Sequence, residues 1–98
     1  MIWHIVWFDM GHLDEETRKD LEGSLAALDD LDVVEWLRIT RDIDNPGITG
    51  LISVFRDMEA LEAYRVHPEH VPVQTKGRDL GVSVVRLDAP TDDMPPAA

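Results

Sequence analysis

The sequence predicts an α+β domain in which four strands and two helices follow one another in the order β-α-β-β-α-β. Two observations predict this fold class. Four short runs are rich in β-branched or aromatic residues, as strands are. Between them lie segments in which apolar residues recur at helical spacing after an aspartate that can cap a helix. The 98 residues fit a single domain.

The first element is a strand over residues 2–9. The first turn-forming residue of the chain, Gly11, comes only after it. Side chains of a strand alternate between its two faces, and here both faces are largely apolar. One face carries His4, Val6 and Phe8, and the other carries Trp3, Ile5 and Trp7. A strand of this kind needs a covering layer on each side.

The second element is a helix that Asp14 can cap, with Glu15 and Glu16 in its first turn. Leucines then recur at helical spacing. They are Leu21, Leu25, Leu28 and Leu31. The pattern predicts an amphipathic helix with an acidic outer face.

Residues 34–42 and 48–55 read as two strands that pair as a hairpin, because residues 44–47 have the composition of a tight turn. Asp57 then caps a second helix. Pro68 disfavours α geometry in the residue before it, so this helix should end near His67.

A short irregular or helical piece is expected next, followed by a last strand over residues 81–88. Residues 89–98 have little apolar bulk and three prolines, which predicts a disordered tail. The domain is therefore expected to span residues 1–88.

Right-handed connections in this element order give a ferredoxin-like fold, with a four-stranded antiparallel sheet and both helices on one face. The other face is left bare. Trp3, Ile5 and Trp7 are assigned to that face, and they predict a homodimer joined through the sheet. The alternative is that Trp3 or Trp7 lies at a strand end under a loop or the tail.

Charge and composition exclude several partners. Asp and Glu number 20 against 9 Lys and Arg, a net charge of −11, which repels nucleic acid and anionic membrane surfaces. An RNA-recognition domain shares the element order, but residues 48–55 carry no basic side chain.

The apolar run at the start is too short to span a membrane. Zero cysteines fit a reducing compartment, so we expect the cytoplasm.

Three segments together are specific: IWHIV at residues 2–6, FRDMEALEAY at 55–64 and HPEHV at 67–71. With them, residues 1–88 resemble the stress-responsive dimeric α/β-barrel family. The resemblance implies a ferredoxin-like domain paired so that two sheets form a barrel, with a pocket in each subunit between sheet and helices. The members of the family include plant stress proteins, uncharacterised bacterial proteins and olivetolic acid cyclase, a cofactor-free enzyme that closes a polyketide by aldol condensation.

The resemblance implies that Tyr64 and His70 match the phenol and imidazole that the cyclase uses, and that His4 matches a histidine of its pocket. One departure is Thr49, which stands where the cyclase has a further pocket histidine. That departure puts activity on the cyclase's own substrate in doubt.

Chemistry leads to the same three residues. An aldol closure needs a base to remove a proton between two carbonyl groups, and a neutral imidazole suits that at neutral pH, so His70 is the candidate base. Tyr64 is the candidate donor to the carbonyl oxygen that gains charge. His4 would orient the substrate or tune the other imidazole. The expected substrate is a small apolar or aromatic carbonyl compound, with no cofactor.

Apolar walls suit such a ligand. The expected wall residues are Val6, Phe8, Thr49, Leu51 and Val71, with Leu21 and Leu25 beside them.

Each candidate also has a structural interpretation. His4 could be a hydrogen-bonded core residue, and Tyr64 could be core because it lies at helical spacing from Leu61. His67 and His70 could bind a metal, but no third ligand is evident, so we expect no metal site.

Three functions therefore stay open. The first is a cofactor-independent cyclase or isomerase. The second is a non-catalytic stress-response or small-molecule-binding protein. The third is a cofactor-free monooxygenase or haem-handling protein, since small dimeric barrels share one architecture.

Overall fold

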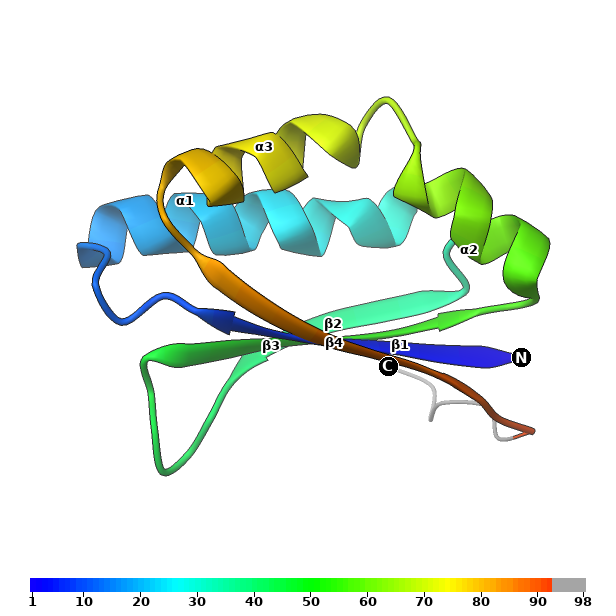
Figure 1. Cartoon of the computed structure of the whole chain (residues 1–98), viewed down its shortest axis with the longest axis horizontal. Coiled ribbons are helices and arrows are strands. Elements are labelled where there is room, and N and C mark those ends of the chain that lie inside the picture. The colour runs from blue at the N-terminus through cyan, green and yellow to red at the C-terminus, as the bar shows by residue number, and fades with distance from the viewer. Residues whose placement is uncertain (93–98) are drawn as a thin grey trace.

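The computed structural model describes residues 1–92, and it contains a four-stranded antiparallel sheet with helices on one of its faces (Figure 1). The elements are β1 (Ile2–Asp9), α1 (Glu15–Ala26), the 3-10 helix η1 (Ala27–Asp30), β2 (Trp36–Arg41), β3 (Ile48–Phe55), α2 (Met58–Arg65), α3 (Val71–Asp79) and β4 (Ser83–Pro90). The strand order is β2-β3-β1-β4. This is the ferredoxin-like α+β fold that the sequence predicts. The segment expected to be irregular or helical is the helix α3.

Both predicted helix caps are present. The side chain of Asp14 accepts a hydrogen bond from the Thr17 amide at 2.8 Å, and that of Asp57 accepts one from the Ala60 amide at 2.9 Å. These bonds satisfy amide groups that have no partner within the first turn of a helix. The caps therefore fix where α1 and α2 begin.

The predicted boundaries of two strands need correction. Strand β2 begins at Trp36 rather than at residue 34, because the Val34 amide donates to the Leu31 carbonyl in a turn. Strand β4 continues to Pro90, which pairs with Ile2, so residues 89 and 90 belong to the sheet and not to a tail. Residues 93–98 of the expected tail lie outside the described residues.

The register of the central strand β1 decides which residues share a face. His4 lies between Ser53 of β3 and Asp88 of β4, on the face that the helices cover. The core between this face and the helices is apolar. It includes Val6, Leu21, Leu25, Leu28, Leu37, Leu51, Phe55, Leu61 and Tyr64.

Within residues 1–92, no helix or strand covers the opposite face of the sheet (Figure 1). Trp7 is 58% exposed, and two residues of β4, Val85 and Leu87, are 60% and 58% exposed. Trp3 and Ile5 are partly buried on the same face. We call these five residues the outer apolar face.

Candidate functional site

A cavity of about 420 Å³ lies between the covered face of the sheet and the helices. It brings together most of the residues that the sequence assigns to a pocket. Those that line it are His4, Val6, Phe8, Leu21, Leu25, Leu51, Tyr64 and His70. They come from β1, α1, β3, α2 and the turn before α3, so only the folded chain assembles them.

His4 is held by a carboxylate that its neighbours in the sequence do not reveal. His4 is buried on β1, and its Nδ1 is hydrogen-bonded to the Oδ1 of Asp88, the residue directly opposite on β4. Arg65 donates to the other oxygen of Asp88 at 3.2 Å. Burial acts to raise the pKa of Asp88, but the hydrogen bonds from His4 and Arg65 outweigh it and hold that pKa below its ordinary value.

An ionised Asp88 accepts a hydrogen bond, so the Nδ1 of His4 carries the proton of the neutral imidazole. Its Nε2 is then the nitrogen that can accept a proton. A carboxylate in this position also stabilises the imidazolium that forms when the ring is protonated.

The rings of Tyr64 and His70 are stacked, with their centroids 4.0 Å apart and their planes inclined by 24°. Burial raises the pKa of Tyr64 well above its usual range, so its hydroxyl stays protonated and can donate. Burial also lowers the pKa of His70, although the nearby carbonyl groups of Arg65 and Tyr64 oppose this. The His70 ring is therefore neutral at pH 7.

The chain reaches this stack through a short turn between α2 and α3. The His67 amide donates to the Tyr64 carbonyl at 3.1 Å, and the His70 amide donates to the His67 carbonyl at 2.9 Å. These bonds reverse the chain after α2 and place the ring of His70 against that of Tyr64. The His4 centroid lies 5.8 Å from that of Tyr64, so the three rings form one cluster.

Two nitrogen atoms beside this cluster are buried and have no hydrogen-bond partner in the described part of the chain. They are the Nδ1 of His70 and the Nε of Arg65. Buried polar groups are nearly always paired in folded proteins. His70 and Arg65 both line the cavity, although these two atoms are themselves buried.

The charged part of the site is not evident from the sequence. Arg65, Arg78 and Arg86 all line the cavity, and Asp88 lies behind His4. The alternation of the last strand could have placed Arg86 and Asp88 on one face. Their position beside His4, however, depends on a pairing between strands more than 70 residues apart in the chain.

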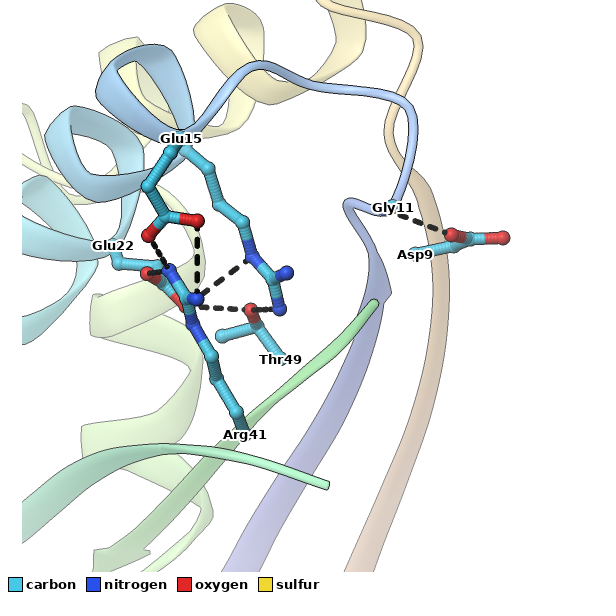
Figure 2. Close-up of polar contacts among 7 residues, drawn as sticks. Asp9, Gly11, Glu15, Glu22, Arg41 and Thr49 are labelled. Carbon is cyan, nitrogen blue, oxygen red and sulfur yellow. Dashed lines mark hydrogen bonds and ion pairs between the residues drawn. The ribbon is translucent and has the colours of Figure 1, made fainter. Parts of the chain in front are cut away.

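Thr49 does not line the cavity, although the sequence assigns it to the wall. Its hydroxyl accepts a hydrogen bond from the buried guanidinium of Arg18 at 2.9 Å and donates one to Glu22 at 2.6 Å. Figure 2 shows Glu22 also bonded to Arg41, which holds Glu15 as well. The side chain of Thr49 thus belongs to a polar network that joins α1 to the sheet.

Val71 is also outside the cavity. It begins α3, its side chain is 43% exposed, and Val73 lines the wall instead. Val71 directly follows His70 in the sequence. The helical turn that starts there directs the two side chains differently.

No group of three or more His, Asp or Glu side chains within residues 1–92 could hold a metal ion. The Nδ1 of His67 accepts a hydrogen bond from the Glu69 amide at 3.1 Å, within its own turn. In the same part of the chain, no helix has the length and apolar character needed to cross a membrane.

Solved structures confirm the fold. SnoaB from Streptomyces nogalater, described as a cofactor-independent oxygenase, matches with a TM-score of 0.79 and 16% identity over 98% of this chain and 97% of that one. At3g17210 from Arabidopsis thaliana matches with a TM-score of 0.76 and 21% identity over 97% and 99% of the two chains. A dimeric ferredoxin-like protein from Jannaschia sp. CCS1 matches with a TM-score of 0.67 and 24% identity over 88% and 96%.

No curated protein matches the sequence. The family model of the stress-responsive A/B barrel domain, in contrast, matches residues 2–90. That span includes all four strands, the three helices and every residue of the ring cluster. The chain therefore belongs to the stress-responsive A/B barrel domain family.

Proposed function

We propose that this chain is a cofactor-independent enzyme of the cyclase or isomerase type, which acts on a small carbonyl or aromatic compound by proton transfer. One observation carries the proposal. An imidazole oriented by a carboxylate, a second neutral imidazole and a protonated phenol surround a single cavity of about 420 Å³. These groups are a proton acceptor and a proton donor beside an apolar wall.

The reaction would begin with loss of a proton from the carbon between two carbonyl groups. An imidazole nitrogen takes this proton, and the electron pair left behind forms an enolate. The enolate carbon then bonds to a second carbonyl carbon of the same molecule, whose oxygen takes the hydroxyl proton of Tyr64. The imidazolium returns a proton to the phenolate, so the product is an isomer of the substrate.

Of the two imidazoles, we assign the proton acceptor to His4. The sequence alone favours His70 for this role. Asp88 would stabilise a positive charge on His4, whereas burial disfavours one on His70, whose pKa is lowered. His70 then acts as a neutral ring that supports Tyr64 and contacts the substrate.

The test is turnover of a panel of β-dicarbonyl and aromatic carbonyl compounds, followed by variants. His4→Gln and Tyr64→Phe should each lower kcat by about 10². His67→Gln is the control, because His67 does not line the cavity, and it should leave kcat unchanged. Turnover that neither of the first two changes reduces tenfold would show that this mechanism is wrong.

Asp88→Asn separates the two candidate bases. If His4 accepts the proton, kcat should fall at least tenfold with little change in KM, because the imidazolium loses its carboxylate. Asp20→Asn removes a carboxylate from an exposed pair with Lys76 and should change neither value. A full loss in His70→Gln with none in Asp88→Asn would move the base to His70.

We also propose that two copies associate through the outer apolar face. Its exposed Trp7, Val85 and Leu87 support this, since contiguous apolar surface on a protein usually marks an interface. The Jannaschia protein of similar fold is described as dimeric.

The cytoplasm remains the expected compartment, because the sequence has no cysteine.

A non-catalytic binding protein is the second candidate. It is favoured by the cavity itself, whose apolar wall would suit a ligand whether or not the ligand reacts. Compounds of the same panel that bind but do not turn over would support it.

A further inference from the structure

The cavity has a charge opposite to that of the whole chain. The sequence carries 20 acidic and only 9 Lys or Arg residues. Three of these nine, Arg65, Arg78 and Arg86, line the cavity, and no aspartate or glutamate of the described residues is part of its lining. Building on the function proposed above, we infer that the substrate is an acid, with a carboxylate held by these arginines and an apolar part against the wall.

The arginines are only partly neutralised within the protein. Arg65 donates to Asp88 at 3.2 Å, and the Nε of Arg86 lies 3.9 Å from the same carboxylate. Asp88 is also bonded to His4. The guanidinium of Arg78 forms no ion pair or hydrogen bond with the described residues. Asp88 therefore contacts two of the three guanidinium groups, and the third has no carboxylate partner, which leaves an excess of positive charge at the cavity.

Helix ends explain only part of this arrangement. Arg65 and Arg78 lie in the last turns of α2 and α3, where main-chain carbonyl groups favour cations. Arg86 lies on β4 and has no such reason to be there. Helix ends also do not require side chains from α2, α3 and β4 to meet at one cavity. A shared anionic ligand accounts for all three positions.

A guanidinium group presents a planar pair of donors that matches the two oxygens of a carboxylate. Ligand pockets span roughly 300–1,000 Å³, so a cavity of about 420 Å³ suits one ring or a short chain. Val6, Phe8 and Leu25 supply an apolar wall for it. The expected class is a small aromatic or aliphatic keto acid.

The experiment compares two probes that differ only in charge, 3-benzoylpropionate and its neutral primary amide, by calorimetric titration against the full chain at low salt. The acid should bind at least tenfold more tightly than the amide. In Arg78→Gln/Arg86→Gln this preference should be lost, while the affinity for the amide stays the same. Both side chains are exposed enough for the variant to fold, which circular dichroism would verify.

Arg56→Gln is the control, because it makes the same Arg-to-Gln change, with the loss of one positive charge, at a side chain that is 72% exposed and outside the cavity. It should keep the preference for the acid. Equal binding of acid and amide, no binding of the acid at millimolar concentration, or an equal loss in Arg56→Gln would overturn the inference. If inorganic phosphate displaced 3-benzoylpropionate as strongly as benzoate does, the assignment to a carboxylate would be overturned.

These outcomes are distinct from those that test the function. Binding is measured without turnover, so a preference for the acid supports this inference even if no compound reacts. Turnover of a neutral ketone without any preference for the acid would overturn this inference and leave the proposed enzyme standing.

Discussion

His70 illustrates how burial changes the chemistry of one side chain. The segment HPEHV, which contains His70, predicts that this residue lies in a pocket. It does not predict whether the imidazole is protonated. In the structure His70 is 8% exposed and its ring lies against Tyr64. The same burial that keeps its imidazole neutral raises the pKa of the Tyr64 hydroxyl. Two adjacent rings are thereby kept in uncharged forms at neutral pH.

This burial predicts a dependence of stability on pH. The pKa of His70 is lower in the folded protein than its ordinary value of 6.5, so the unfolded chain binds more protons as the pH falls through that region. The free energy of unfolding should therefore fall from about pH 6.5 toward pH 5. Urea denaturation at several pH values measures it.

His70→Gln is the comparison, since it removes this titration. Its free energy of unfolding should fall less over the same pH range, even if the variant is less stable at neutral pH. Asp88 does not interfere, because its pKa lies below the ordinary value of 3.8 and its contribution is lost only at lower pH. Equal pH slopes in the two proteins would contradict the prediction.

At the residue scale, sequence motifs found the rings of the site but not its charges. His4, Tyr64 and His70 were found because they lie in short recognisable segments. Asp88 was not found, because it meets His4 only through strand pairing across 84 positions. Thr49 was misplaced for the related reason that the position of a residue on a strand does not reveal which helix side chain covers it.

At the scale of elements, local signals placed the beginnings of helices more reliably than the ends of strands. Asp14 and Asp57 act through hydrogen bonds to amides three residues later, which a sequence shows directly. The end of β4 at Pro90 depends instead on a partner, Ile2 of β1. Strand length is therefore decided by a neighbouring strand that local sequence does not identify.

The connection from α3 to β4 gives a prediction at this scale. Gly81 has a φ of +71°, and an added Cβ there would meet only ordinary contacts, so strain and not a clash opposes a side chain. Gly81→Ala should lower the free energy of unfolding by about 1 kcal/mol. Denaturant unfolding provides the measurement.

Gly23→Ala is the control for the same chemical change. Gly23 lies within α1 with open space around it, so alanine should stabilise the protein by roughly 0.5–1 kcal/mol. Opposite signs are expected at the two positions. Similar effects at both would show that the backbone at Gly81 is not strained by a side chain.

At the scale of the whole molecule, one strand has two different surroundings. One face of β1 contributes His4, Val6 and Phe8 to the cavity, while the other contributes Trp3, Ile5 and Trp7 to the outer apolar face. If two copies associate as proposed, a change on either face can alter the candidate site and the association together. A dimer would hold β1 in place from the side opposite the cavity.

The dimer proposal predicts a change of mass. Trp7→Glu/Leu87→Glu places two charges on the outer apolar face, where both parent side chains are 58% exposed. Light scattering after gel filtration should then give 11.1 kDa rather than twice that mass. The dimer should be lost because burying an unpaired charge at an interface costs free energy.

Val66→Glu serves as the control, because Val66 is 75% exposed but lies at the end of α2 on the helix side. It should leave the mass unchanged. A dimer that survives the double change, or a parent protein that is monomeric throughout, would contradict association through this face.

The element order, the helix caps and the two-sided character of β1 can all be predicted from the sequence, because periodicity and capping are local properties of the chain. The sequence also identified the three rings of the site. The folded chain is needed to see that Asp88 holds His4, that three arginines line the cavity, and that Thr49 bonds to Arg18. These contacts depend on strand register and on how helices lie across the sheet. Both are set by packing among segments far apart in the chain.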